Sequence, residues 1–134
     1  MKTKLALGTA ALGLLLAAVP VMAHHSFAAE FDSAKPIKLT GSVTKIEWMN
    51  PHAYFYIDVK DEKTGQTANW GLEMGSPNGL MRQGWTRNSM KVGDVVTVEG
   101  SAAKDGSNIG NARSVTLSGG QRLFAASSQT QANP

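Results

Sequence analysis

Cysteine is absent from the 134 residues of the sequence. This absence excludes disulfide bonds, zinc sites built on thiolates, iron–sulfur clusters and catalysis by a cysteine nucleophile. The fold must therefore be held together by packing alone. Hydrophobic residues make up 42% of the chain, which is enough for the core of one domain of this size.

Charge of either sign is also scarce, at 17% of residues. Two of the 13 basic residues, Lys2 and Lys4, lie in an expected leader, so the net charge of +3 falls to +1 for the rest of the chain. Proteins that bind nucleic acid need a basic surface for the phosphates. We therefore expect no nucleic-acid partner.

Residues 1–23 have the three parts of a secretory signal peptide. Two lysines are followed by an apolar run over 5–19 and by a small-residue cleavage site that ends at Ala23. A membrane anchor is the alternative, but the apolar run is shorter than the roughly 20 residues that a span needs. We expect cleavage after Ala23, no stable membrane insertion afterwards, and a periplasmic or secreted protein that starts at His24.

Period-two alternation of apolar residues predicts several short strands. In the clearest one, over 52–60, Phe55 and Ile57 share one face while Tyr54 and Tyr56 share the other. The other predicted strands cover 37–48, 66–74, 95–99, 112–117 and, as a short sixth strand, 122–124. The first strand changes its buried face between Val43 and Ile46, which predicts a bend or bulge, with Gly41 as the candidate pivot.

A short helix is expected between the third and fourth strands. Ser76 is a favourable N-cap, Pro77 suits the first helical position, and Gly84 can end the helix after Gln83. We expect Leu80, Met81 and Trp85 to face the core.

This order of elements predicts an all-β fold with one short helix, an OB-like five-stranded antiparallel barrel. Another small β-sandwich or barrel is the alternative. The expected divisions are a signal peptide over 1–23, a lead-in over 24–36, the barrel domain over 37–124 and a disordered tail over 125–134. Eight residues are expected to be mostly buried: Phe55, Ile57, Trp70, Leu72, Val96, Val98, Val115 and Leu117.

The three histidines are the candidate metal ligands. Cleavage after Ala23 would place an amine and an imidazole on His24, and His52 or His25 would complete a nitrogen-rich site. Copper(II) favours such tetragonal nitrogen sites, so copper is the expected metal. The competing interpretation is that the His24–His25 pair is only a solvated terminus and that His52 only satisfies backbone groups of a turn.

Tyr54, Tyr56 and Trp48 form a candidate ligand-binding face, because OB-type barrels often bind ligands on aromatic surfaces. Two simpler interpretations stay open. The lead-in residues Phe27 and Phe31 would cover the tyrosines, and Trp48 would belong to the core or its rim.

Motifs of hydrolytic enzymes are missing from the sequence. It has no HExxH pair, no nucleophile elbow and no P-loop ending. Its scattered carboxylates, Glu30, Asp32, Glu47 and Glu73, are expected to be solvated surface charges. We therefore assign no catalytic residue, and a binding role is favoured over an enzymatic one.

A set of short motifs is distributed along the chain: Ala23-His24-His25-Ser26-Phe27, Glu47-Trp48, Asn50-Pro51-His52, Trp70 with Glu73, Ser76-Pro77, Gly84-Trp85 and Gly93-Asp94. This pattern resembles an uncharacterised family of small exported bacterial proteins, a domain of unknown function whose mature chains open His-His-Ser-Phe. The resemblance implies export and a small β-barrel, and it implies no activity.

The leading hypothesis is a periplasmic, non-enzymatic binding module that binds copper through its processed amino-terminal histidine. The second is a small-molecule or protein-interaction module that uses the barrel face without metal. The third is a small copper-dependent redox enzyme.

Overall fold

The computed structural model describes residues 27–127, which form six strands and two short helices. The helices are α1 (Phe27–Glu30) and α2 (Pro77–Arg82). The strands are β1 (Phe31–Glu47), β2 (Tyr54–Lys60), β3 (Thr67–Glu73), β4 (Val95–Ala103), β5 (Ile109–Thr116) and β6 (Arg122–Phe124). No helix within 27–127 is long and apolar enough to cross a membrane.

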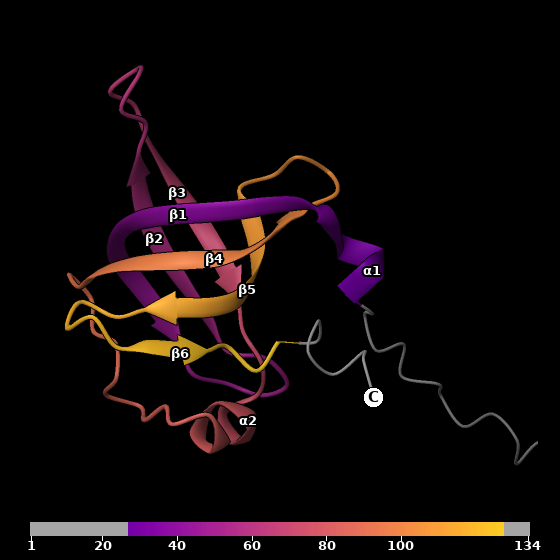
Figure 1. Cartoon of the computed structure of the whole chain (residues 1–134), viewed down its shortest axis with the longest axis vertical. Helices are drawn as coiled ribbons and strands as arrows, with labels where there is room; N and C mark the ends of the chain where they lie inside the picture. The colour runs from indigo at the N-terminus through magenta and orange to yellow at the C-terminus, as the bar shows by residue number, and fades with distance from the viewer. Residues whose placement is uncertain (1–26, 128–134) are drawn as a thin grey trace, which may run out of the picture.

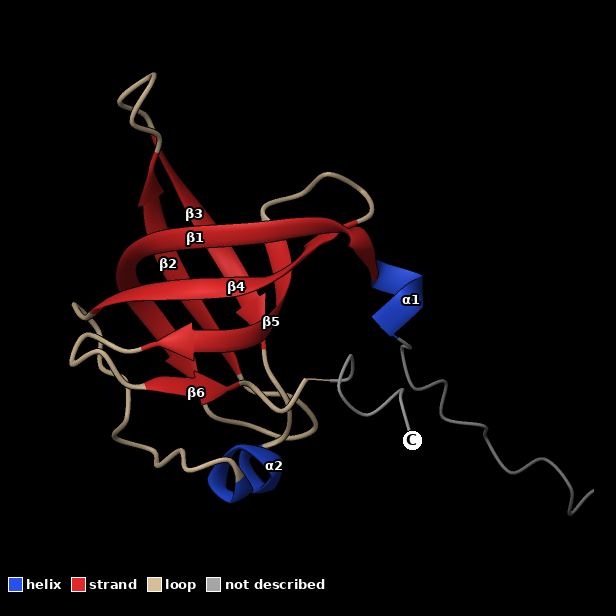
Figure 2. Cartoon of the chain, in the orientation of Figure 1, coloured by secondary structure: helices blue, strands red, loops and turns tan. Residues whose placement is uncertain are grey.

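Five of these strands close into a ring, in the order β1-β2-β3-β5-β4 and back to β1 (Figures 1 and 2). The long strand β1 pairs with β2 through one part and with β4 through another. The ring closes through β3 and β5, which pair in parallel, whereas the other pairings are antiparallel. A bent first strand shared by two half-sheets and a helix between β3 and β4 confirm the predicted OB-like fold.

The bend in β1 is confirmed, and a bulge accompanies it. The register with β2 shifts between Val43 and Lys45, so Thr44 is the extra residue. Gly41 lies just before this shift, where a Cβ atom would overlap the backbone of Asp58. The glycine therefore lets β1 approach β2 closely at the bend.

Strand β1 begins at Phe31, six residues before the predicted start at Ile37. Phe31 and Asp32 already pair with Ala103 and Ala102 of β4, and Pro36 marks a register shift rather than the start of the domain. The predicted lead-in thus becomes part of the sheet, and it also supplies the unpredicted helix α1. Proline is tolerated here because a bulge needs no amide donor at that position.

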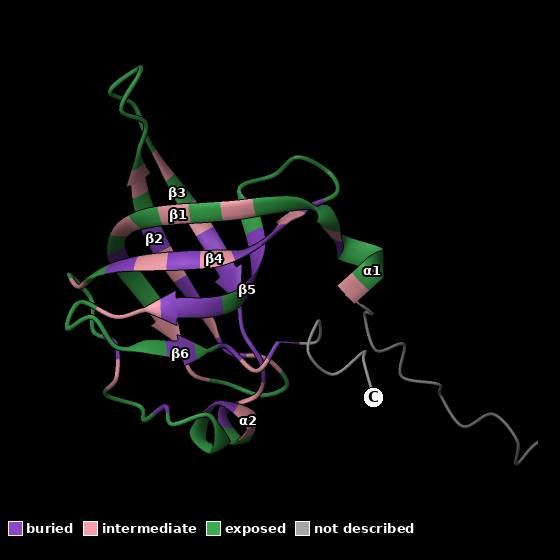
Figure 3. Ribbon diagram, in the orientation of Figure 1, coloured by how far each residue is buried: buried purple, intermediate pink, exposed green. Residues whose placement is uncertain are grey.

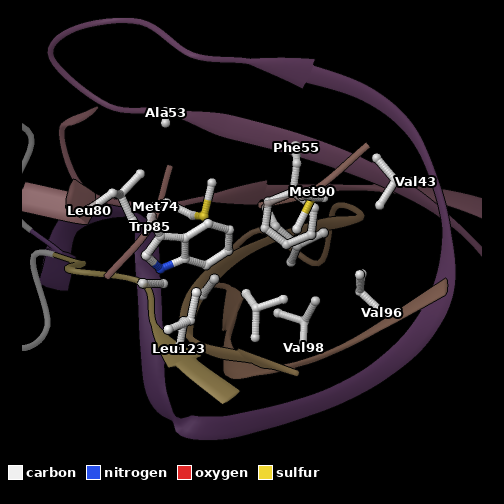
Figure 4. Packing of buried hydrophobic residues seen from close by; sticks show 14 of the residues in the cluster. Val43, Ala53, Phe55, Met74, Leu80, Trp85, Met90, Val96, Val98 and Leu123 are labelled. Carbon is white, nitrogen blue, oxygen red and sulfur yellow. The ribbon is translucent and has the colours of Figure 1, made fainter. Parts of the chain in front are cut away.

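The core fills the inside of the ring. Phe55, Ile57, Leu72, Val96, Val98 and Val115 are buried as predicted, whereas Trp70 and Leu117 are only partly buried. Figure 4 shows labelled core side chains inside the ring, and Figure 3 shows the contrast between buried β4 and β5 and the exposed β2–β3 loop.

Helix α2 covers one end of the core, as predicted. The Ser76 side chain accepts a hydrogen bond from the Gly79 amide, so it is the N-cap. Leu80 and Trp85 are buried, and the Trp85 indole donates to the Phe124 carbonyl at 2.8 Å. The prediction for Met81 was wrong: it is 52% exposed, because a six-residue helix buries only one narrow stripe.

The predicted start of the disordered tail, at residue 125, is too early. Residues 125–127 are ordered against the ring: the Ala125 amide donates to Arg113, and its carbonyl accepts from Gly75. Ala125 and Ser127 are fully buried. Small side chains fit there because the backbone lies directly against Gly75, where a Cβ atom would overlap Ala126. The remaining residues of the predicted tail and the predicted signal peptide lie outside the described part of the chain.

Candidate functional site

Tyr54 and Glu73 form the centre of a polar cluster on the outer side of the β2–β3 pair. They are register partners, and the Tyr54 hydroxyl donates a hydrogen bond of 2.7 Å to Oε2 of Glu73. Only 6% of Glu73 is exposed. Burial raises the pKa of Tyr54, and the hydrogen bond and the negative charge of Glu73 raise it further. Tyr54 therefore stays protonated and keeps donating to the carboxylate.

His52 joins the cluster from the turn before β2. Its Nδ1 lies 3.2 Å from the carbonyl oxygen of Met74 and 3.7 Å from Oε1 of Glu73. The backbone brings these groups together because Ala53 and Met74 pair through the Met74 amide. The backbone group that His52 contacts belongs to Met74, after β3, and not to the Asn50-Pro51 turn. The histidine still has 34% of its side chain exposed.

Tyr56 occupies the next outward position on β2 and has a different environment. Its ring lies over Gly71, where a Cβ atom would come within 3.1 Å of Cε1 of the tyrosine. Its hydroxyl lies 3.3 Å from Oε2 of Glu47, and the Lys45 ammonium lies 5.3 Å from the ring centroid. Lys45 and Glu47 also form an ion pair, which lowers the pKa of Glu47 and raises that of Lys45.

Trp48 does not join the tyrosines. It is partly buried against the core and lines a small hollow of about 10 Å³ that also includes Met74, Trp85 and Met90. The candidate ligand face is therefore reduced to Tyr54 and Tyr56, and Trp48 has the rim position that the simpler interpretation predicts.

A pocket of about 450 Å³ opens beside Tyr54 and Glu73. It is lined by the end of α1, the start of β1, and the loop between β4 and β5, which lie on the same side of the ring (Figure 1). Phe31 lines this pocket together with Tyr54, and the rings of Phe27 and Phe31 are 5.7 Å apart. Phe31 and Tyr54 thus lie on one pocket, and Tyr56 is not part of its lining.

The metal site predicted from sequence falls partly outside the described residues. His24 and His25 lie before residue 27, and only His52 has a described position. Within 27–127, no group of three histidine, aspartate or glutamate side chains is placed to hold a metal ion.

Glu73 is the functional candidate that sequence reasoning missed. The sequence predicts it to be one of several solvated surface charges. The side chain does point away from the core, but Tyr54 and the neighbouring strand β5 cover it. Its register partner on β5, Asn111, is fully buried, and the side-chain amide of Asn111 has no hydrogen-bond partner among the described residues. The signal that could have identified Glu73 is that it and Tyr54 both occupy outward positions on neighbouring strands.

Comparison with solved structures finds the mitochondrial single-stranded DNA-binding protein Rim1 of S. cerevisiae. The match has a TM-score of 0.49 and 14% identity, and it covers 62% of this chain and 92% of that one. A comparison with curated proteins finds no match. A family model matches residues 11–113, which is most of the sequence. The chain therefore belongs to the family described as "Family of unknown function (DUF6152)".

Proposed function

We propose that this protein is an exported, non-enzymatic binding module that holds one copper(II) ion through its processed amino terminus. The ligands are the amine and imidazole of His24 and the imidazole of His52, with His25 as the alternative partner. The observation that carries the proposal is the contact between Nδ1 of His52 and the carbonyl of Met74.

That contact determines which nitrogen of His52 is free for a metal. A carbonyl oxygen can only accept, so Nδ1 carries the proton and Nε2 carries the lone pair. Metal-bound histidines commonly donate their second ring nitrogen to a carbonyl or carboxylate in this way. Oε1 of Glu73 lies 3.7 Å from Nδ1 of His52. The contact with Met74 therefore supports a ligand role for Nε2 of His52.

The described start of the chain supports the participation of His24. Helix α1 begins at Phe27, three residues after His24, and a chain of that length spans at most about 10 Å. The last residues of α1, Ala29 and Glu30, line the same pocket as Glu73, which contacts His52. The leader pattern of residues 1–23 supports export, and cleavage after Ala23 would free the amine.

The chemistry of the ligands predicts a dependence on pH. An amino-terminal amine has an ordinary pKa of about 8 and an imidazole of about 6.5. Both must lose a proton to bind copper, so affinity should fall as the pH is lowered towards 5.

Copper titration of the processed protein tests this function. The native protein is compared with a form that carries one alanine before His24, and binding is followed by the visible absorption of copper(II). The extra residue converts the His24 amine into an amide, so affinity should fall strongly. His52→Gln should weaken binding less or equally, and Glu62→Gln, on the exposed β2–β3 loop, is the matched control. Equal affinities of the native and extended proteins would refute the amino-terminal site.

A second candidate function is a module that binds a small molecule without metal. The pocket beside Tyr54 and Glu73 favours it, because its volume of about 450 Å³ lies in the usual range for small-molecule sites.

A further inference from the structure

The charges and the walls of the pocket beside Tyr54 and Glu73 point to a particular class of ligand. We propose that this pocket binds a small organic monocation, a primary ammonium or amidinium group carried on an apolar body. The inference rests on the second candidate function and needs no copper.

The ionisable groups of the lining are mainly acidic. Glu30, Glu73 and Asp105 contribute three carboxyl groups, against the single ammonium of Lys104. The Lys104 ammonium donates to the Ala28 carbonyl at 2.5 Å, so it is held at α1. The Asp105 carboxylate accepts from the amide and hydroxyl of Ser107, and these bonds lower its pKa. The lining therefore attracts a cation and repels an anion.

Glu73 is the carboxylate best prepared to hold a cation. Its side chain is 9% exposed, its Oε2 accepts a hydrogen bond from the Tyr54 hydroxyl, and its Oε1 lies 3.7 Å from Nδ1 of His52. An ion pair at a largely desolvated carboxylate is stronger than one on the open surface, because less water screens it.

Apolar walls surround these charges. Phe31 and Ala103 are buried beside the pocket, and Ile109 lines it while remaining 45% exposed. An exposed isoleucine at the mouth of a pocket costs free energy that an apolar ligand would recover by covering it. The aromatic rings of Phe31 and Tyr54 are also favourable neighbours for an organic cation.

A bare metal ion fits this pocket less well than an organic cation. Within 27–127, no three histidine or carboxylate side chains converge for coordination. The volume of about 450 Å³ greatly exceeds what a bare ion fills, and the walls offer apolar contact that an ion cannot use.

A set of three matched probes tests the charge of the ligand. We would titrate 2-phenylethylammonium, neutral 2-phenylethanol and anionic 3-phenylpropanoate into the processed protein that carries the extra alanine before His24, with chelator present. Amide chemical shifts in 1H–15N spectra report the site. The cation should produce saturable shifts at Glu30, Tyr54, Glu73 and residues 104–109, and the other two probes should bind at least about tenfold more weakly.

Substitutions then separate the contributions of the two carboxylates. Glu73→Gln, which keeps the shape, should weaken the cation about fivefold or more, and Glu30→Gln on the surface of α1 about twofold. Glu62→Gln is the control and should change nothing. If Glu73→Gln disturbs the spectrum as a whole, Glu30→Gln decides the outcome.

Three results would overturn the inference: no saturable binding of the cation, equal binding of cation and anion, or no effect of either pocket substitution. If the neutral or anionic probe binds these residues as tightly as the cation does, the charge of the proposed ligand is wrong, although a metal-free ligand site remains. Copper binding is measured separately, on the protein without the extra alanine. A failure of the copper proposal can therefore be distinguished from a failure of this inference.

Discussion

The hydroxyl of Tyr54 donates a hydrogen bond of 2.7 Å to the carboxylate of Glu73, directly across the β2–β3 pair. The bond joins two outward positions of the sheet into a polar pair in which Glu73 is buried and Tyr54 is partly buried. Glu73 belongs to both candidate sites, because it contacts His52 and also lines the pocket.

Removal of this hydroxyl should destabilise the fold. Tyr54→Phe leaves a buried carboxylate oxygen without its donor, and we expect the free energy of unfolding to fall by about 1–2 kcal/mol. Tyr56→Phe is the matched control, since its bond to the less buried Glu47 is longer, at 3.3 Å. Urea denaturation measures both, and an equal loss for the two variants would contradict the special role of Tyr54.

Alkaline pH should act through the same hydroxyl. The pKa of Tyr54 in the folded protein is raised above its ordinary value of 10.0 by burial and by Glu73. Above about pH 10 the unfolded chain loses this proton first, so stability is retained below that pH and falls as the pH rises further. Absorbance of tyrosinate should show one late ionisation that disappears in Tyr54→Phe. If the tyrosinate absorbance of the native protein shows no such late ionisation, this account is contradicted.

Gly41→Ala tests the close approach at the bend of β1. The new Cβ atom would overlap the carbonyl of Asp58, so we expect a loss of about 1–3 kcal/mol in the free energy of unfolding. Gly119→Ala is the control, because no atom lies within 4 Å of a Cβ atom there. Thermal denaturation compares the two, and an unchanged midpoint for Gly41→Ala would show that the strands can separate at no cost.

Truncation tests the unexpected order of residues 125–127. A chain that ends at Phe124 loses the bond from the Ala125 amide to Arg113 and leaves the buried Gly75 amide without the Ala125 carbonyl. We expect it to lose about 2–4 kcal/mol of stability. A chain that ends at Ser127 keeps both bonds and serves as the control. Equal stability of the two chains would mean that these bonds contribute nothing.

Local patterns in the sequence were sufficient for the strands and for helix α2. The alternation of Phe55 and Ile57 with Tyr54 and Tyr56 reflects the period of a strand with one buried face, and Ser76 followed by Pro77 marks a helix start. These signals act over a few residues, so they can be interpreted without knowledge of the partners.

The early start of β1 was not predictable in this way. Nothing in residues 31–36 alternates clearly, and Pro36 suggested a break. The strand forms there because Phe31 and Asp32 find partners in Ala103 and Ala102, some seventy positions further along the chain. The exposure of Met81 has a similar cause, since the position of α2 on the core decides which stripe of the helix is covered.

The sequence by itself determined the OB-like order of elements, the inner face of each main strand and the outward direction of Tyr54 and Tyr56. It did so because backbone periodicity and turn chemistry are local. Only the tertiary structure decided that β3 meets β5 in parallel, that Glu73 is buried, and that His52 presents Nδ1 to Met74. Those outcomes depend on the closure of the ring. Closure brings side chains from distant segments together and removes water from them, and no single segment of the chain carries that information.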